Sequence, residues 1–218
     1  MSWRITPTQP IPAVIGEPFG GGYFAGYISH TADGVPTHSL IVAPRATGAT
    51  GTGYALTTML AWKTTNTITA GTNSDFDGSA NTAAMVTAGI ADHPAANFCK
   101  NLSIGGFTDW YLPARRELDI AYFNLKPSTE SNIANFGINI YSVPQRNANW
   151  TAGYPAQTAL TAFSTSAEAF IASGHWSSTG SAIVASISYM IRFSDGLDFN
   201  IGLKPSLLTV RAFRRIAL

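Results

Sequence analysis

Charged residues are scarce in this chain of 218 residues. Asp, Glu, Lys and Arg make up 11% of it, whereas about 25% is usual for soluble domains. The 13 basic and 12 acidic residues leave a net charge of +1, so the chain has no basic excess with which to hold a phosphate backbone. The composition therefore argues against a nucleic-acid partner.

Long apolar runs and cysteine pairs are also missing. No apolar stretch approaches the roughly 20 residues that cross a bilayer. The first seven residues, MSWRITP, contain no apolar segment followed by a small-residue cleavage site, so neither a membrane span nor a signal peptide is expected. Cys99 is the only cysteine, which excludes an intrachain disulfide and a thiolate metal cluster. We expect a chain made in the cytoplasm, with no cofactor and no membrane partner.

Small neutral residues and aromatic residues are abundant instead. Ala, Gly, Thr and Ser together account for 94 of the 218 residues. Because 45% of the chain is hydrophobic and Phe is present 12 times, the chain can bury a core and should fold. We predict a proline-rich, extended arm over residues 1–20 and one domain over residues 21–218.

Strand patterns occupy both ends of this domain, and helical patterns occupy its middle. Period-two alternation predicts strands at 23–28, 39–43, 183–193, 197–201 and 208–213, with a tight turn at Asp195 and Gly196. Helical spacing predicts helices at 81–88, after a cap at Asp92, at 113–125 and at 128–136. These patterns indicate an α+β domain with two to four central helices and long loops, whose terminal strands meet in one antiparallel sheet.

Three short motifs follow one another along the domain. Residues 105–113 read GGFTDWYLP, residues 175–179 read HWSST and residues 210–214 read VRAFR. In this order they resemble the G-x-x-D-W-R-L-P-x-x-x-E-L, Y-W-S-S-T and V-R-x-V-R motifs of the DUF1566 family, which includes the carboxy-terminal domain of the Legionella collagen-like adhesin. Tyr111 and His175 depart from the pattern, which has Arg and Tyr there. The resemblance implies a C-type-lectin-like fold, related in architecture to formylglycine-generating enzymes and to phage receptor-binding proteins.

The motif residues are interpreted as scaffold. Large indole rings fill cores, hydroxyl groups satisfy backbone groups, and arginines pair with carboxylates through two bonds. On that basis Arg211 and Arg214 should pair with Asp109 or Glu117. The residues assigned to this structural motif are Asp109, Trp110, Leu112, Pro113, Glu117, Trp176, Ser177, Ser178, Arg211 and Arg214.

Candidate catalytic and metal-binding residues have simpler interpretations. His175 is either a base or a partly buried side chain, and Cys99 is either an oxidisable thiol or a small core residue; we favour the second in both cases. Residues 73–78, NSDFDG, match the first half of a calcium loop, but Ala84 stands where the loop requires Glu. No catalytic residue and no metal site is assigned.

Residues 141–155 combine aromatic rings, amides and a cation without hydrophobic periodicity, as binding loops do. The predicted ligand-binding residues are Tyr141, Arg146, Asn147, Asn149, Trp150 and Tyr154. Together with the resemblance, they predict a non-enzymatic phage virion protein, located in a tail fibre, tail tip or head fibre, that binds a host-surface glycan or protein receptor. A homotrimer that contacts other virion proteins through its arm is expected. The alternatives are a purely structural head decoration or tail component, and an enzyme on a formylglycine-generating-type fold.

Overall fold

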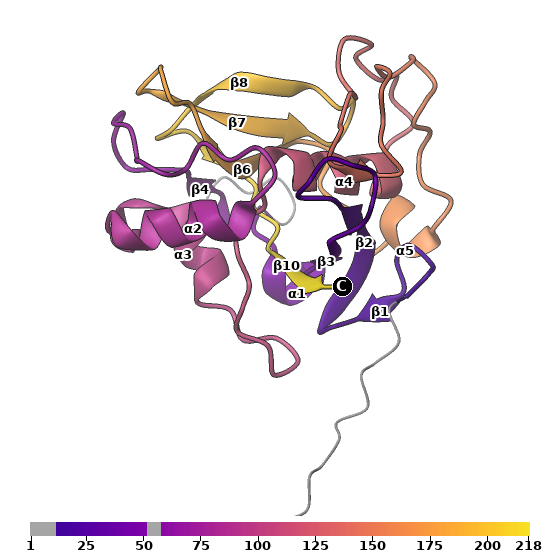
Figure 1. Ribbon diagram of the computed structural model, residues 1–218, viewed down its shortest axis with the longest axis horizontal. Helices are drawn as coiled ribbons and strands as arrows, with labels where there is room; N and C mark the ends of the chain where they lie inside the picture. The colour runs from indigo at the N-terminus through magenta and orange to yellow at the C-terminus, as the bar shows by residue number, and fades with distance from the viewer. Residues whose placement is uncertain (1–11, 52–57) are drawn as a thin grey trace, which may run out of the picture.

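The computed structural model describes residues 12–51 and 58–218, and its largest sheet joins the two ends of this part of the chain (Figure 1). β2 (Gly22–Ile28) pairs antiparallel with β3 (His38–Val42), and β3 pairs antiparallel with β10 (Phe213–Ala217). β1 (Pro18–Phe19) and β5 (Ser142–Val143) both pair with β2. The predicted strands at 23–28 and 39–43 thus meet the carboxy-terminal strand in one antiparallel sheet, whereas the predicted strands at 183–193 and 197–201 belong to a second sheet.

A second sheet is an antiparallel meander of β6 (Gly174–Gly180), β7 (Ile187–Arg192) and β8 (Asp198–Leu203). The turn between β7 and β8 contains Gly196 at φ +73°, as the Asp-Gly pair predicts. The strand expected from residue 183 begins only at Ile187, because Ile183 lies in a loop and is 89% exposed. A short pair, β4 (Leu60–Ala61) and β9 (Leu207–Leu208), completes the strands.

Three longer helices lie between the strands, as predicted. They are α2 (Gly78–Thr87), α3 (Pro94–Lys100) and α4 (Arg115–Leu125). Asp77 caps α2 through its carboxylate, whereas the expected cap of α3, Asp92, belongs to the 3-10 turn η3 (Ile90–Asp92), and His93 takes the cap position. α1 (Arg45–Gly48) and α5 (Thr161–Ser164) are single turns.

Two predicted elements are wrong. Residues 128–136 form loop and turn instead of a helix, and the Ile133 N–H donates to the Asp195 carbonyl in a long-range bond of 2.9 Å. The strand expected at 208–213 is interrupted, since β9 ends at Leu208 and β10 starts at Phe213. Residues 209–212, between these two strands, are buried, and their backbone forms hydrogen bonds with distant segments. For example, the Ala43 N–H donates to the Ala212 carbonyl at 2.9 Å.

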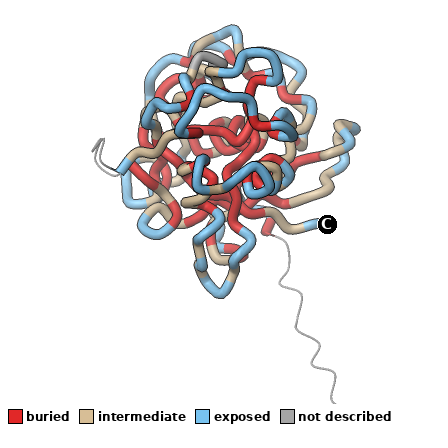
Figure 2. Tube along the Cα trace, turned by 90° about the vertical axis from the view of Figure 1, so that its left-hand side faces the viewer, coloured by how far each residue is buried: buried red, intermediate tan, exposed pale blue. Residues whose placement is uncertain are grey.

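α4 is the central layer of the domain. It packs against β2 of the first sheet and against β6 and β7 of the second. Its apolar stripe, with Leu118, Ala121, Tyr122 and Leu125, is buried, as the spacing predicts. Figure 2 shows this buried interior surrounded by exposed loops. Among the described residues, no helix combines the length and apolar character needed to cross a membrane.

The described part of the expected arm lies on the domain. Pro18 and Phe19 form β1, and Ile15 packs against both clusters of the hydrophobic core. The Tyr27 hydroxyl donates to the Pro12 carbonyl at 3.0 Å. Residues 1–11 of the predicted arm lie outside the described residues.

Candidate functional site

The connection between α4 and α5 contains the predicted ligand-binding residues. It runs from residue 126 to residue 160, and within it only β5 is a strand. In Figure 1 this connection forms long loops beyond the end of α4. Loops carried by a rigid scaffold are the usual location of binding residues.

Five of the six predicted residues line one hollow in this region. Its volume is about 300 Å³. Tyr141 is the exception, since its ring stacks on Phe76 with centroids 4.4 Å apart and an angle of 22° between the planes. The residues that line the hollow are Phe123, Arg146, Asn147, Ala148, Asn149, Trp150, Thr151 and Tyr154.

Trp150 forms part of the floor of this hollow. The side chain is only 4% exposed, and it stacks on Phe123 with centroids 5.9 Å apart and 19° between the planes. Trp150, which the sequence predicts as a ligand-binding residue, is therefore a core residue that offers the hollow only a small exposed surface. Phe123 is not among the predicted residues because it lies on α4, outside the loop from which they were drawn.

Arg146 is fixed in place by several contacts. Its Nε donates to the Gly137 carbonyl at 3.2 Å, and its Nη2 pairs with the Asp119 carboxylate. The guanidinium carbon lies 4.5 Å from the Phe123 ring centroid and 5.1 Å from that of Trp150. Because Asp119 is 3% exposed, this ion pair stands at the junction of loop and core, and it neutralises the charge beside the hollow.

The outer wall of the hollow is open to solvent. Tyr154 is 59% exposed, and its ring meets Phe123 edge-on at 5.5 Å. Asn147 and Asn149 are exposed as well. The hollow thus combines aromatic rings, two exposed amides and a paired guanidinium, a combination that suits recognition of a polar ligand with apolar faces.

Arg211 and Arg214 each pair with a carboxylate, and only one of the two pairs is a predicted one. Arg214 donates to both carboxylate oxygens of Asp109, at 2.8 and 2.9 Å, which confirms one predicted pair. Arg211 instead pairs with Glu168 at 2.8 Å, so the prediction of Asp109 or Glu117 as its partner is wrong. Glu168 precedes β6 in a loop without periodicity, and only the tertiary structure places it there.

Glu117 has neutral partners. Its Oε1 accepts from the Tyr111 hydroxyl at 2.7 Å, and its Oε2 accepts from the N–H groups of Ala114 at 2.7 Å and Gly78 at 3.2 Å. Burial raises the pKa of Glu117 to about 7, although the hydrogen bonds from Ala114 and Tyr111 act to lower it. Tyr111 thus stands where the DUF1566 motif usually has Arg, and its hydroxyl donates to Glu117, which matches the Glu of the same motif.

The remaining motif residues are buried. Trp110 and Trp176 are buried, and so are Leu112 and Pro113 at the entry to α4. The Ser177 hydroxyl donates to the Tyr189 carbonyl at 2.9 Å, and the Ser178 hydroxyl accepts from the Asn81 amide at 3.1 Å. These serines lie in β6, so they join that strand to its neighbours.

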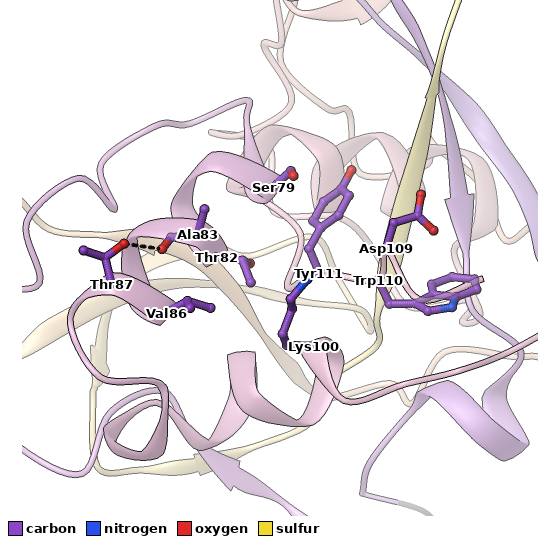
Figure 3. A pocket seen from close by; sticks show the side chains of 9 residues that line it. All are labelled: Ser79, Thr82, Ala83, Val86, Thr87, Lys100, Asp109, Trp110 and Tyr111. Carbon is purple, nitrogen blue, oxygen red and sulfur yellow. Dashed lines mark hydrogen bonds between the residues drawn. The ribbon is translucent and has the colours of Figure 1, made fainter. Parts of the chain in front are cut away.

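A second hollow, of about 390 Å³, lies beside the motif (Figure 3). Most of its polar groups bond within the protein: the Thr87 hydroxyl donates to the Ala83 carbonyl at 3.1 Å, and the Thr82 hydroxyl accepts from the Leu112 N–H at 3.2 Å. Asp109 and Tyr111 have the partners described above. The lining residues are Ser79, Thr82, Ala83, Val86, Thr87, Lys100, Asp109, Trp110 and Tyr111.

The candidate catalytic residues are inside the core. His175 is 3% exposed between Phe170 and Phe193, and burial lowers its pKa to about 3. Cys99 is fully buried, and burial raises the pKa of its thiol. Both positions agree with the core interpretation.

The half calcium loop serves the scaffold. Asp77 caps α2 and pairs with Arg215 at 2.7 Å, while Asp75 lies 3.8 Å from Arg115. Within residues 12–51 and 58–218, no group of three or more His, Cys, Asp or Glu side chains is arranged to hold a metal ion.

Comparison with known proteins leaves the family open. No family model and no curated protein matches the chain. Among solved structures, a fimbrial protein from Bacteroides ovatus ATCC 8483 is similar at 18% sequence identity, with a TM-score of 0.35, over 62% of this chain. The match spans 24% of that protein's length. Similarity at this level assigns neither fold family nor function, and the resemblance to DUF1566 stays a prediction.

Proposed function

We propose that this chain is a non-enzymatic, C-type-lectin-like protein of a phage virion, in a tail fibre, tail tip or head fibre, and that its loop hollow binds a receptor on the host surface. The observation that carries this proposal is the hollow itself. Five residues chosen for their chemistry, spread from Arg146 to Tyr154, line one open depression next to a rigid helix. Exposed Tyr and Asn residues beside a buried Trp are typical of recognition surfaces.

The arrangement of the domain supports the lectin-like part of the proposal. The strand and helix patterns predict an α+β domain whose terminal strands meet in one sheet, and β2, β3 and β10 form such a sheet. The Asp-Trp motif and the terminal arginine meet in the Asp109–Arg214 pair, as a shared scaffold would require. The near-neutral composition suits a subunit packed in an assembly, and a homotrimer is the proposed state.

Adsorption measurements test receptor binding. The purified chain, fluorescently labelled, would be applied to cells of the bacterium in which the encoding phage grows. We expect Asn149→Ala and Tyr154→Ala to lower cell binding at least tenfold without changing the circular dichroism spectrum, because both side chains are exposed. Asn66→Ala, at an exposed position in another loop, is the matched control and should bind like the wild type.

Particle composition tests the virion assignment separately. Mass spectrometry of purified phage particles should detect the chain. Its absence from particles would contradict every virion role, whereas its presence with no cell binding by the wild-type chain would favour the structural decoration alternative.

A further inference from the structure

The turn at residues 151–157 lines two hollows: the one beside Tyr154 described above, called the receptor hollow below, and a neighbouring one. The neighbouring hollow has a volume of about 280 Å³, close to the 300 Å³ of the receptor hollow. The turn contributes Thr151 and Tyr154 to the receptor hollow, and it contributes Gly153 and Gln157 to the neighbouring one. The residues that line this neighbouring hollow are Lys126, Thr129, Glu130, Ala152, Gly153, Pro155, Ala156 and Gln157.

The backbone of the turn is closed on itself. The Thr151 N–H donates to the Tyr154 carbonyl at 3.0 Å, and the Tyr154 N–H donates to the Thr151 carbonyl at 3.2 Å. Further on, the Gln157 amide donates to the Pro127 carbonyl at 2.7 Å. The turn therefore forms a ridge of fixed shape between two hollows.

A buried polar network supports this ridge from below. Asn132 is 5% exposed, and its amide nitrogen donates to the carbonyls of Pro155 at 2.9 Å and Thr151 at 3.1 Å. Its oxygen accepts from the Lys126 ammonium at 2.8 Å and from the Tyr122 hydroxyl at 2.5 Å. Lys126, which is 2% exposed, thus joins α4's end to the ridge.

Burying such a polar network has a free-energy cost that an apolar core does not have. Burying an ammonium and an amide costs several kcal/mol unless every polar atom finds a partner, and apolar side chains of the same volume would fill the space without that cost. What the network provides is a ridge whose backbone positions are set before a ligand arrives. Fixed positions reduce the conformational entropy that binding would otherwise lose.

The groups around the ridge select a class of ligand. Asn147, Asn149 and Thr129 offer amides and a hydroxyl, Tyr154 offers an exposed ring, and the guanidinium charge of Arg146 is already paired. Glu130 adds an exposed carboxylate to the neighbouring hollow, which can accept hydrogen bonds from ligand hydroxyls and repels an anionic ligand. A neutral, hydroxyl-rich ligand matches these groups better than a strongly charged one. Because there is a hollow on either side of the turn, a ligand longer than a single unit fits better than a monomer.

We propose that a linear, largely neutral polysaccharide straddles this ridge, with one stretch in the hollow beside Tyr154 and the next in the hollow beside Gln157, and that Asn132 and Lys126 are positioning residues for it. This inference rests on the proposed receptor function and names its ligand. A protein receptor is the competing ligand, and the experiment separates the two.

The first experiment treats host cells before adding the full chain. Periodate, which oxidises vicinal hydroxyls, should abolish binding, and proteinase treatment should leave it intact. Polysaccharide extracted from the cell envelope should compete for binding, as should its longer hydrolysis fragments, whereas its monosaccharides should not. Thr129→Ala, which alters only the neighbouring hollow, should lower affinity for the polysaccharide at least threefold.

The outcomes distinguish this inference from the proposed function. Binding that survives periodate and is lost with proteinase would overturn the polysaccharide while leaving receptor binding in place. Competition by monosaccharides, or unchanged affinity of Thr129→Ala, would overturn the straddling arrangement. A wild-type chain that binds no untreated cells would overturn both.

The positioning role has its own control. Asn132→Ala should lower polysaccharide affinity at least tenfold at a temperature where the variant is folded. Asn81→Ala removes an amide that is equally buried in α2, where it bonds Ser74 and Ser178 away from the ridge. Asn81→Ala should lose stability but keep its affinity; an equal loss of affinity in both variants, or none in Asn132→Ala, would overturn the positioning role.

Discussion

Arg214 and Asp109 form a pair with unequal exposure. The Arg214 side chain is 7% exposed, whereas the Asp109 side chain is 54% exposed. The guanidinium also donates to the Gly20 carbonyl at 2.9 Å and stacks 3.9 Å from the Phe107 ring centroid. The pair therefore joins β10, the turn before β2 and the motif segment before α4.

This asymmetry predicts the effect of removing the carboxylate. Asp109→Ala leaves a buried guanidinium with one carbonyl acceptor, which should cost about 2 kcal/mol of unfolding free energy. Urea unfolding of Asp109→Ala, Arg214→Met and the double variant should give a coupling energy of about 1 kcal/mol or more. Additive effects would show that the two side chains contribute independently.

Glu117→Gln should lower the unfolding free energy far less than Glu117→Ala. Glu117→Ala leaves the N–H groups of Ala114 and Gly78 and the Tyr111 hydroxyl without their acceptor, so it should cost about 3 kcal/mol. Gln keeps an oxygen for the two N–H groups and can donate to the Tyr111 oxygen, so Glu117→Gln should cost about 1 kcal/mol or less. Urea midpoints at pH 7 compare the two; equal losses would contradict the hydrogen-bonding role.

Gly196 lies where a side chain has no room. A Cβ atom there would approach the Tyr122 ring to 2.5 Å and the Trp150 Nε1 to 3.0 Å, and its φ is +73°. Gly106 has a similar φ of +82°, but a Cβ atom would meet nothing within 4 Å. Both Ala variants should lose about 1 kcal/mol to backbone strain. Thermal unfolding should show a further loss only for Gly196→Ala, since only that Cβ clashes.

The environment of His30 predicts that the protein is less stable in acid. Burial lowers the pKa of His30 from 6.5 to about 4, with Arg215 and His38 acting in the same direction and Asp77 opposing them. The Arg215 Nη1 lies 3.3 Å from the His30 Nε2, and the His38 ring centroid lies 4.4 Å from that of His30. Phe76 packs edge-on against the same ring.

The direction of this pH effect on the unfolding free energy depends on whether the folded or the unfolded chain binds a proton on His30 more readily. Between pH 6.5 and about 4 the unfolded chain protonates His30 while the folded chain does not, so the unfolding free energy falls as the pH falls through this range. His30→Gln should recover about 3 kcal/mol of that loss at pH 4. Urea midpoints from pH 7 to pH 4 provide the measurement, and parallel curves for wild type and variant would refute the assignment.

Local patterns predicted much of the fold. The spacing of Leu118, Ala121, Tyr122 and Leu125 identified α4, and Asp-Gly identified the turn before β8. The strand interruption between Leu208 and Phe213 was missed, because the intervening residues are satisfied by long-range bonds to segments near Ala43 and Gly48. An apolar run does not show which distant backbone groups it will meet.

Sequence alone determined the composition of the site, and the tertiary structure decided its geometry. Residue chemistry was enough to select Arg146, Asn149 and Tyr154, which line one hollow, and to predict that Arg214 pairs with Asp109. Only folding decided that Arg211 pairs with Glu168 and that Trp150 is buried beneath the hollow. The physical reason is that side-chain chemistry and short-range periodicity are local properties, whereas burial and ion pairing depend on which segments the sheets and α4 bring together.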